Sequence, residues 1–231
     1  MNGIKKNIEF INGEISKTLN SCNRDDDVIL IAVSKTVDVE QMDEALDSGI
    51  ENFGENKVQE VERKYANISK KAVWHLIGSL QTNKVKYIIE TVDLIHSLDR
   101  ISLAKEIDKK AKENELIMNC LIQVNISLED SKHGLLLEDV ENFIKQVSSD
   151  YKNIKILGLM GMAPFEENPE MTRPYFKKLK TLFNELSTLS LENVEMKYLS
   201  MGMTNDYKIA IEEGSNMVRI GTGIFGQRNY V

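Results

Sequence analysis

The chain has 231 residues, enough for one large α/β domain or two small ones, and 42% of them are hydrophobic, as in an ordinary soluble protein. Its formal net charge of −7, without a long basic cluster, argues against a nucleic-acid-binding surface. No apolar stretch is long enough to span a bilayer and no apolar signal core follows the first residues, so neither a membrane protein nor a secreted protein is expected.

Short apolar runs alternate with amphipathic helical stretches along the chain, after a leading helix predicted over residues 2–20. The apolar runs predict strands at residues 28–33, 50–53, 73–77, 94–96, 117–124, 154–160, 196–199 and 217–220. Helices are predicted between them, at residues 38–49, from near 55, around 85–89, and at 101–111, 140–147, 169–186 and 204–214. Asp38 and Asp99 are the predicted N-caps of the helices that follow them.

This alternation predicts a (β/α)8 barrel of the TIM type, with the leading helix as an addition at its N-terminal end. The barrel uses nearly the whole chain, so residues 1–231 are expected to form a single domain. A doubly wound open sheet has the same alternation of strands and helices and is the alternative. In a parallel barrel, ligands bind at the carboxyl ends of the strands, and the candidate site residues are expected there.

Lys35 follows the first apolar run, Val28-Ile-Leu-Ile-Ala-Val33, after a single serine. If this run is the first strand of a parallel barrel, the Lys35 amine stands at the barrel mouth, where a desolvated lysine is a nucleophile toward an aldehyde. Imine formation with a carbonyl cofactor is then the leading interpretation. The alternative is an ordinary solvated lysine just past the end of a strand.

Two loops late in the chain combine glycine with hydroxyl side chains: Leu199-Ser-Met-Gly-Met-Thr204 and Ile220-Gly-Thr-Gly223. They follow predicted strands seven and eight, which is the common phosphate site of TIM barrels. Glycine lets backbone N–H groups approach an anion, a hydroxyl adds a hydrogen bond, and a helix starting near Thr204 would add its positive end. Tight strand-to-helix turns, which favour the same residues, are the alternative.

Arg219 lies inside predicted strand eight, between two apolar residues. Arginine is costly in a barrel strand unless it is paired, so Arg219 is either part of a buried ion pair or a donor to a ligand atom at the barrel mouth. Asn56, after strand two, either hydrogen-bonds a ligand or starts the next helix. Trp74 and His75 alternate in strand three, so one of the two faces inward, and a buried, hydrogen-bonded histidine is the expected outcome.

The histidines and cysteines form no pattern of metal ligands. His75, His96 and His133 have no His-x-x-x-His spacing, and Cys22 and Cys120 lie far apart in the chain. We therefore expect no metal site, two free thiols and a cytoplasmic location.

Seven separated motifs run in order from about residue 28 to residue 226: Ala32-Val-Ser-Lys-Thr36, Asn52-Phe-Gly-Glu-Asn56, Trp74-His-Leu-Ile-Gly78 with Leu80-Gln-Thr-Asn-Lys84, Gln123-Val-Asn-Ile-Ser127, Gly158-Leu-Met160, Leu199-Ser-Met-Gly-Met203, and Val218-Arg-Ile-Gly-Thr222 with Ile224-Phe-Gly226. Together they resemble the pyridoxal phosphate homeostasis protein family, whose members are also called proline synthetase co-transcribed proteins. The resemblance covers nearly the whole chain.

The resemblance implies a barrel like the N-terminal domain of alanine racemase, with pyridoxal 5′-phosphate (PLP) held as an imine on Lys35. It places Arg219 at the pyridine nitrogen and Asn56 near the ring. It assigns Ser200, Thr204, Gly221 and Thr222 to the phosphate, and the implied cofactor-binding set also includes Met201. One departure is visible, because Val37-Asp38 replaces the usual Lys-Pro after Ser-Lys-Thr. The change removes a basic residue near the mouth and bears on PLP exchange.

The implied arginine at the ring nitrogen also bears on function. A carboxylate there keeps the nitrogen protonated and the ring a strong electron sink, whereas arginine does not. In alanine racemases the second acid–base group, a tyrosine, comes from another domain, for which this chain leaves no room. We therefore expect a monomeric PLP-binding protein of vitamin B6 homeostasis, with no catalytic residue assigned, that buffers PLP or delivers it to PLP-dependent apo-enzymes. The alternative is a barrel enzyme, either a PLP-dependent amino-acid racemase or a Schiff-base aldolase.

Overall fold

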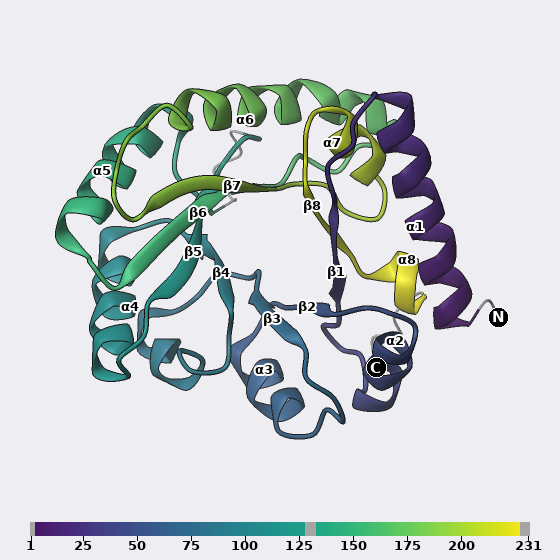
Figure 1. Cartoon of the computed structure of the whole chain (residues 1–231), viewed down its shortest axis with the longest axis horizontal. Helices are drawn as coiled ribbons and strands as arrows, with labels where there is room; N and C mark the ends of the chain where they lie inside the picture. Colours follow the sequence, from purple (N-terminus) through teal and green to yellow (C-terminus); the bar gives the residue numbers. More distant parts are fainter. Residues whose placement is uncertain (1–2, 128–132, 227–231) are drawn as a thin grey trace.

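The computed structural model describes residues 3–127 and 133–226, and its parallel strands close into an eight-stranded barrel in chain order (Figure 1). The strands are β1 (Ile29–Val33), β2 (Asn52–Glu55), β3 (Val73–Leu76), β4 (Leu94–Leu98), β5 (Met118–Val124), β6 (Ile154–Gly161), β7 (Val194–Ser200) and β8 (Met217–Ile220). β1 pairs with β2 on one side and with β8 on the other, which closes the sheet. The closed barrel confirms the predicted (β/α)8 fold and excludes the open-sheet alternative.

Helices cover the outside of the barrel and connect its strands (Figure 1). Those with α geometry are α1 (Ile4–Ser21), α2 (Val39–Asp47), α3 (Val58–Tyr65), α4 (Ile101–Glu113), α5 (Val140–Asp150), α6 (Arg173–Leu186), α7 (Tyr207–Glu212) and α8 (Thr222–Phe225). Short 3-10 segments are η1 (Thr82–Tyr87), η2 (Leu137–Asp139) and η3 (Pro169–Thr172). Within the described ranges, no helix is both long and apolar enough to cross a bilayer.

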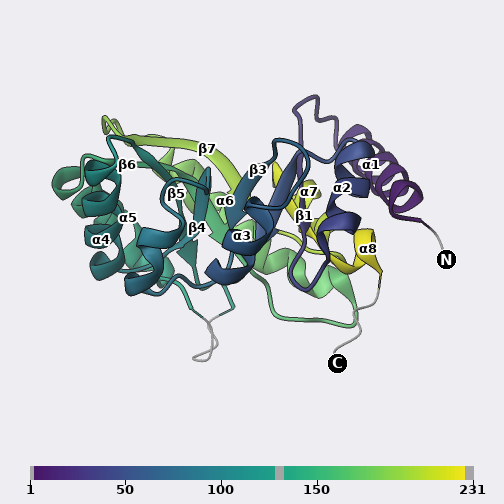
Figure 2. The same ribbon diagram turned by 90° about the horizontal axis from the view of Figure 1, so that it is seen from below.

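Helix α1 precedes the barrel and packs on its outside. Its isoleucines recur at helical spacing and are buried, which explains why this segment folds as an amphipathic helix: Ile4, Ile8, Ile11 and Ile15. Figure 2 shows α1 together with α2 and α8 at the end of the molecule opposite α4 and α5. Residue 2, with which the predicted leading helix begins, lies outside the described residues.

Two connections after the early strands differ from the prediction. α3 begins at Val58 rather than near Glu55, because Glu55 is the last residue of β2 and its side chain is buried. The predicted helix after β3 is the 3-10 segment η1, and the three-residue spacing of the buried Val85 and Ile88 suits the 3-10 repeat. Asp38 is the N-cap of α2, as predicted, although its side chain makes no capping hydrogen bond.

Two later helix starts were also predicted wrongly. Arg100, not Asp99, is the N-cap of α4, and the Arg100 guanidinium donates instead to the Asp99 carboxylate at 2.7 Å. Helix α7 does not begin near Thr204. The Asp206 carboxylate accepts the Met203 N–H at 2.6 Å, which holds a tight turn and leaves Thr204 outside the helix.

The strands bury side chains on both of their faces. On the outer face, Trp74 packs against the rings of Phe53 and Tyr65, each at a centroid distance of 6.1 Å. On the inner face, apolar side chains fill the barrel: Ile31, Leu94, Leu121, Leu157, Met160 and Met217. His75 is buried among these inner residues and hydrogen-bonded, as predicted for one member of the Trp74–His75 pair.

Candidate functional site

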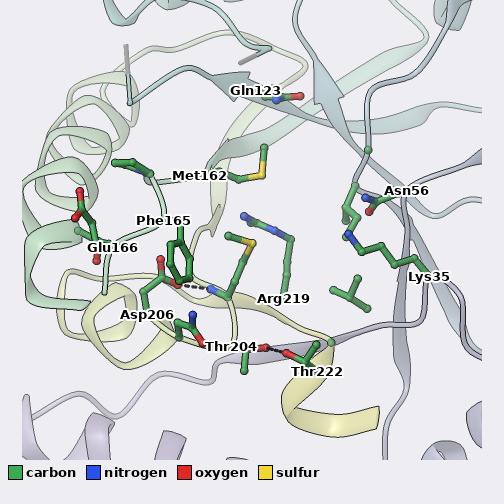
Figure 3. Close-up of a pocket in the computed structure, with 18 of the residues that line it drawn as sticks. Lys35, Asn56, Gln123, Met162, Phe165, Glu166, Thr204, Asp206, Arg219 and Thr222 are labelled. Atoms are coloured by element: carbon green, nitrogen blue, oxygen red, sulfur yellow. Dashed lines mark hydrogen bonds between the residues drawn. The ribbon is translucent and has the colours of Figure 1, made fainter. Parts of the chain in front are cut away.

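A cavity of about 540 Å³ opens at the carboxyl ends of the barrel strands. Residues from loops far apart in the chain line it, together with Arg219 from β8 itself. Figure 3 shows Lys35 and Arg219 directed into the same space, with Thr204 and Thr222 close together at its edge. A cavity of this size at this end of a TIM barrel is typical of a small-molecule site.

Lys35 stands just beyond β1 and reaches into the cavity beside Asn56 (Figure 3). Its side chain is half-buried, and no ion pair or hydrogen bond joins its amine to another described residue. The next residue, Thr36, has a φ of 63°, a left-handed conformation that is rare for a β-branched side chain. Backbone strain of this kind concentrates at functional sites, and here it lies directly after the lysine.

A buried cluster behind Lys35 holds the backbone that carries it. Lys64 of α3 is fully buried and donates to the Ser34 carbonyl oxygen and to Glu55 Oε1, both at 2.7 Å. The Ser34 hydroxyl donates to the same carboxylate oxygen at 2.6 Å. Burial raises the pKa of Glu55, and the Lys64 ammonium opposes this shift. Sequence reasoning missed this cluster. The available signal was the position of Lys64, three residues after Val61 and therefore on the buried face of α3.

Arg219 presents a buried guanidinium to the cavity. Its Nη1 donates to the Ser200 hydroxyl at 2.6 Å, and its Nη2 donates to the Gly161 carbonyl oxygen at 3.0 Å. Burial lowers the pKa of Arg219 to about 10, because the interior disfavours the charged form. No ion pair joins Arg219 to any described residue, so the structure does not contain the buried ion pair considered as an alternative. The donors that these two bonds leave free are available to a ligand.

The loops after β7 and β8 bring two hydroxyls together. Thr222 Oγ1 donates to Thr204 Oγ1 at 3.2 Å. Thr222 also begins α8, and the first N–H groups of a helix have no partner within it. A Cβ on Gly223 would lie 2.9 Å from Ile220 Cγ2, so glycine lets the loop pass this close. Hydroxyls and unpaired N–H groups are the donors that an anion such as phosphate requires.

Most of the predicted site residues meet at the cavity: Lys35, Asn56, Thr204, Arg219, Gly221 and Thr222. Ser200 and Met201 do not line it, and both are fully buried. The Ser200 hydroxyl is instead within hydrogen-bond distance of His96 and Arg219. The contact of Ser200 and Met201 with a cofactor stays a prediction.

Sequence reasoning missed two kinds of residue at the cavity. Gln123 of β5 is buried, its Nε2 donates to the His133 carbonyl oxygen at 3.1 Å, and its Oε1 has no described partner. Strand alternation, which turns Gln123 inward, was the available signal. Phe165 and Met203 add apolar surface at the mouth. Met203 lies in the Leu199–Met203 motif but was not assigned to the site, and no sequence pattern indicated Phe165. Over residues 3–127 and 133–226, no group of three or more His, Cys, Asp or Glu side chains could hold a metal ion.

This combination of barrel, lysine and hydroxyl-lined corner places the chain in the class of the alanine racemase barrel. The family model described as the alanine racemase N-terminal domain matches residues 15–229. An alanine racemase from Clostridium difficile 630, solved as a complex with cycloserine, shares the fold, with a TM-score of 0.74 and 16% identity. The match covers 96% of this chain and 60% of the racemase chain.

Within that class, the chain belongs to the pyridoxal phosphate homeostasis protein family. It is 46% identical over 202 residues to the family member of Aquifex aeolicus (strain VF5), covering 87% of each chain. The Escherichia coli (strain K12) member is 36% identical over 242 residues, covering 100% of this chain and 99% of the relative. The structure of PipY of Synechococcus elongatus PCC7942 with PLP bound has a TM-score of 0.78 and 33% identity, covering 92% of this chain and 100% of PipY. These findings confirm the family predicted from the motifs.

Proposed function

We propose that this protein binds PLP and serves intracellular PLP homeostasis, buffering or delivering the cofactor with little or no turnover. The observation that carries the proposal is the Lys35 amine, which has no described partner and faces the same cavity as Arg219. Membership of the family and the PLP-bound structure of PipY support the choice of cofactor. In this proposal Lys35 bonds the aldehyde carbon of PLP as an imine.

The polar groups of the cavity fit three of the polar groups of PLP. The amine of Lys35 suits the aldehyde, and the guanidinium of Arg219 suits the pyridine nitrogen. The hydroxyls of Thr204 and Thr222, with the start of α8, suit the phosphate. The cavity volume of about 540 Å³ lies within the range of small-molecule sites, roughly 300 to 1,000 Å³.

The residues at the cavity favour binding over catalysis. When bound, PLP supplies an electron sink whose strength depends on protonation of its ring nitrogen. The guanidinium of Arg219 can donate a hydrogen bond but cannot accept one, so it stabilises an unprotonated nitrogen and a weak sink. We infer that Arg219 orients the ring without activating it.

The described lining of the cavity lacks the tyrosine that supplies the second acid–base group in alanine racemases, although Glu166, His133 and Asp206 line it. Racemisation requires proton donors and acceptors on two opposite faces of the substrate carbon, and no tyrosine is among the described residues that line the cavity. The Asp206 carboxylate is engaged with the Met203 N–H, and burial raises the pKa of Asp206. No observation favours the alternative of an amino-acid racemase or a Schiff-base aldolase.

The finer parts of the proposal concern partners and location. We propose delivery to PLP-dependent apo-enzymes, a monomeric state and a cytoplasmic location. Free thiols at Cys22 and Cys120 support a reducing compartment. The net charge of −7 supports the expectation that nucleic acid is not a partner.

Visible absorbance after incubation with PLP and gel filtration tests the proposal. We expect the protein to retain a visible absorbance band, because the imine on Lys35 is conjugated with the PLP ring and the covalent bond keeps this chromophore on the protein during gel filtration. The Lys35→Ala variant should lose the band, whereas the control Lys105→Ala, at an exposed lysine of α4, should keep it. A colourless protein that cannot be loaded with PLP would exclude the cofactor.

A further inference from the structure

A line of hydrogen bonds crosses the barrel interior from β2 to Arg219. Asn52 Oδ1 lies 3.0 Å from His75 Nε2, and His75 Nδ1 lies 2.9 Å from His96 Nε2. His96 Nδ1 lies 3.2 Å from the Ser200 hydroxyl, which also accepts the bond from Arg219 at 2.6 Å. The line joins the first residue of β2, at the N-terminal end of the barrel, to the cavity at the opposite end.

The surroundings of this line are closed and apolar. His96 and Ser200 are 0% exposed, and His75 and Arg219 are 3% exposed. The other inward side chains include the apolar set that fills the barrel, and Gln123 is an inward polar residue at the cavity. Buried polar atoms lower stability unless they are hydrogen-bonded, and the line gives every ring nitrogen of the two histidines a partner.

The direction of the hydrogen bonds follows from what each group can donate. The Asn52 carbonyl oxygen can only accept, so His75 carries its proton on Nε2 and accepts at Nδ1. His96 then donates from Nε2 and accepts at Nδ1 from the Ser200 hydroxyl. The Ser200 oxygen keeps a lone pair for Arg219, and each donor has an acceptor. The reverse direction would require the Asn52 amide to be turned over and would leave the Ser200 proton without a described acceptor.

Both imidazoles are neutral in this arrangement. Burial lowers the pKa of His75 to about 4. Burial also holds the pKa of His96 well below its usual range, and the neighbouring His75 ring and the Arg219 guanidinium add to this shift by disfavouring a second positive charge. The Asp206 carboxylate, in the loop between β7 and α7, is the acidic group that acts on Arg219 from outside the line. The positive charge of the hydrogen-bonded line is therefore that of the Arg219 guanidinium, at the end that faces the cavity.

We propose that this line holds the Arg219 guanidinium in one orientation toward the cavity, and that its positioning residues are Asn52, His75, His96 and Ser200. In this role the Ser200 hydroxyl is committed to His96 and Arg219 and does not contact a ligand phosphate. A guanidinium fixed in this way directs its free donors to one place, which suits a planar ligand with an aromatic nitrogen acceptor. That last step rests on the proposed function, whereas the positioning of Arg219 does not.

Nitrogen NMR of the histidine rings in the ligand-free full chain tests the proton arrangement. A His133→Gln variant removes the exposed third histidine and leaves the two buried rings in the spectrum. We expect both rings to be neutral and protonated at Nε2 at neutral pH. A proton on His96 Nδ1, or a charged ring, would overturn the proposal.

Solvent exchange of the Arg219 Nε proton tests the positioning itself. In Ser200→Ala we expect exchange to be about tenfold faster, the scale of one hydrogen bond to a charged group. Ser97→Ala is the matched control, because Ser97 is a buried serine of β4 whose hydroxyl has no described partner. Unchanged exchange in Ser200→Ala, or equal acceleration in the control, contradicts the proposal.

A second variant covers the case in which Ser200→Ala does not fold. Asn52→Leu removes the acceptor at the half-buried end of the line, far from the cavity. Without that acceptor we expect His75 to populate both neutral tautomers. A single retained Nε2-protonated form would show that Asn52 does not set the direction of the line.

Absorbance of the protein loaded with PLP separates this inference from the proposed function. In Ser200→Ala we expect the absorbance maximum to shift in the same direction as in Arg219→Lys. Weaker PLP retention with an unshifted maximum would assign Ser200 to the phosphate and overturn its positioning role. If the unaltered protein binds no PLP, the proposed function fails. The histidine ring spectra and the Arg219 exchange rates then still test whether the hydrogen-bonded line positions Arg219.

Discussion

Arg219 is the side chain on which the character of the site depends most. Its described partners, the Ser200 hydroxyl and the Gly161 carbonyl, are neutral, so neither cancels the charge of the guanidinium. The Asp206 carboxylate acts on Arg219 electrostatically, but no ion pair joins these two described residues. A buried charge without a directly paired counter-ion lowers stability, and natural proteins keep such groups mainly where they serve a site. The charge is therefore best understood as directed toward a ligand.

The paired hydroxyls give the first prediction at this scale. Replacing Thr222 by valine removes a donor and leaves the shape of the side chain nearly unchanged. We expect Thr222→Val to weaken PLP retention by about 1–3 kcal/mol, the scale of one hydrogen bond to a charged group. Equilibrium dialysis against PLP measures the change. Thr188→Val, on an exposed threonine, is the control, and equal retention by both variants would remove Thr222 from the phosphate site.

The buried histidines give a prediction for acid stability. The pKa of His75 falls from 6.5 to about 4 on folding, so the unfolded chain binds the proton more tightly than the folded one. Its contribution is present above about pH 6.5 and is lost as the pH falls toward about 4, amounting to roughly 3 kcal/mol. Urea unfolding across this range should show the loss, and His75→Gln should reduce the slope. An identical slope in the variant would show that His75 is not the source.

At the scale of secondary-structure elements, the buried cluster of Ser34, Glu55 and Lys64 links β1, β2 and α3 through hydrogen bonds. Lys64 comes from α3, Glu55 is the last residue of β2, and Ser34 directly follows β1. The cluster holds the backbone that carries Lys35, so the position of this lysine depends on the packing of α3.

Removal of Lys64 tests this account of the cluster. Lys64→Met leaves the Glu55 carboxylate buried without its cation, and we expect unfolding free energy to fall by about 3–5 kcal/mol. Because the pKa of Glu55 is raised in the folded state, its protonation supports folding at low pH and that support is lost as the pH rises through the raised pKa. The loss should therefore be larger at high pH. Lys70→Met, in an exposed pair with Asp47, should cost less than about 1 kcal/mol. Similar losses for both variants would contradict the account.

Local apolar runs were sufficient to predict the strands, because most barrel strands are buried on both faces and therefore read as short continuous apolar segments. Helix starts were less predictable, since they depend on contacts that the pattern does not contain. Glu55 belongs to β2 and its side chain pairs with Lys64, and the turn before α7 depends on the bond between Asp206 and Met203. The pairing of His75 with His96 depends on the alignment of β3 with β4, which no local signal specifies.

At the scale of the whole molecule, closure of the barrel brings motifs that are far apart in the chain to one cavity. The fold match covers nearly all of this chain but 60% of the alanine racemase chain, so the shared barrel is only part of that enzyme. We expect the PLP-loaded protein to interconvert the alanine enantiomers no faster than free PLP does, because the described cavity lining contains no tyrosine. A chiral assay measures this rate, and turnover well above the free-PLP background would restore the racemase alternative.

The central claim is that Lys35 holds PLP covalently. Borohydride reduction of the PLP-treated protein, followed by denaturing mass measurement and peptide mapping, tests it most directly, because reduction makes the linkage permanent. The account predicts one added pyridoxyl phosphate group on the peptide that contains Lys35, and none on that peptide in Lys35→Ala. An unmodified chain, or a group carried by a different lysine, would contradict it.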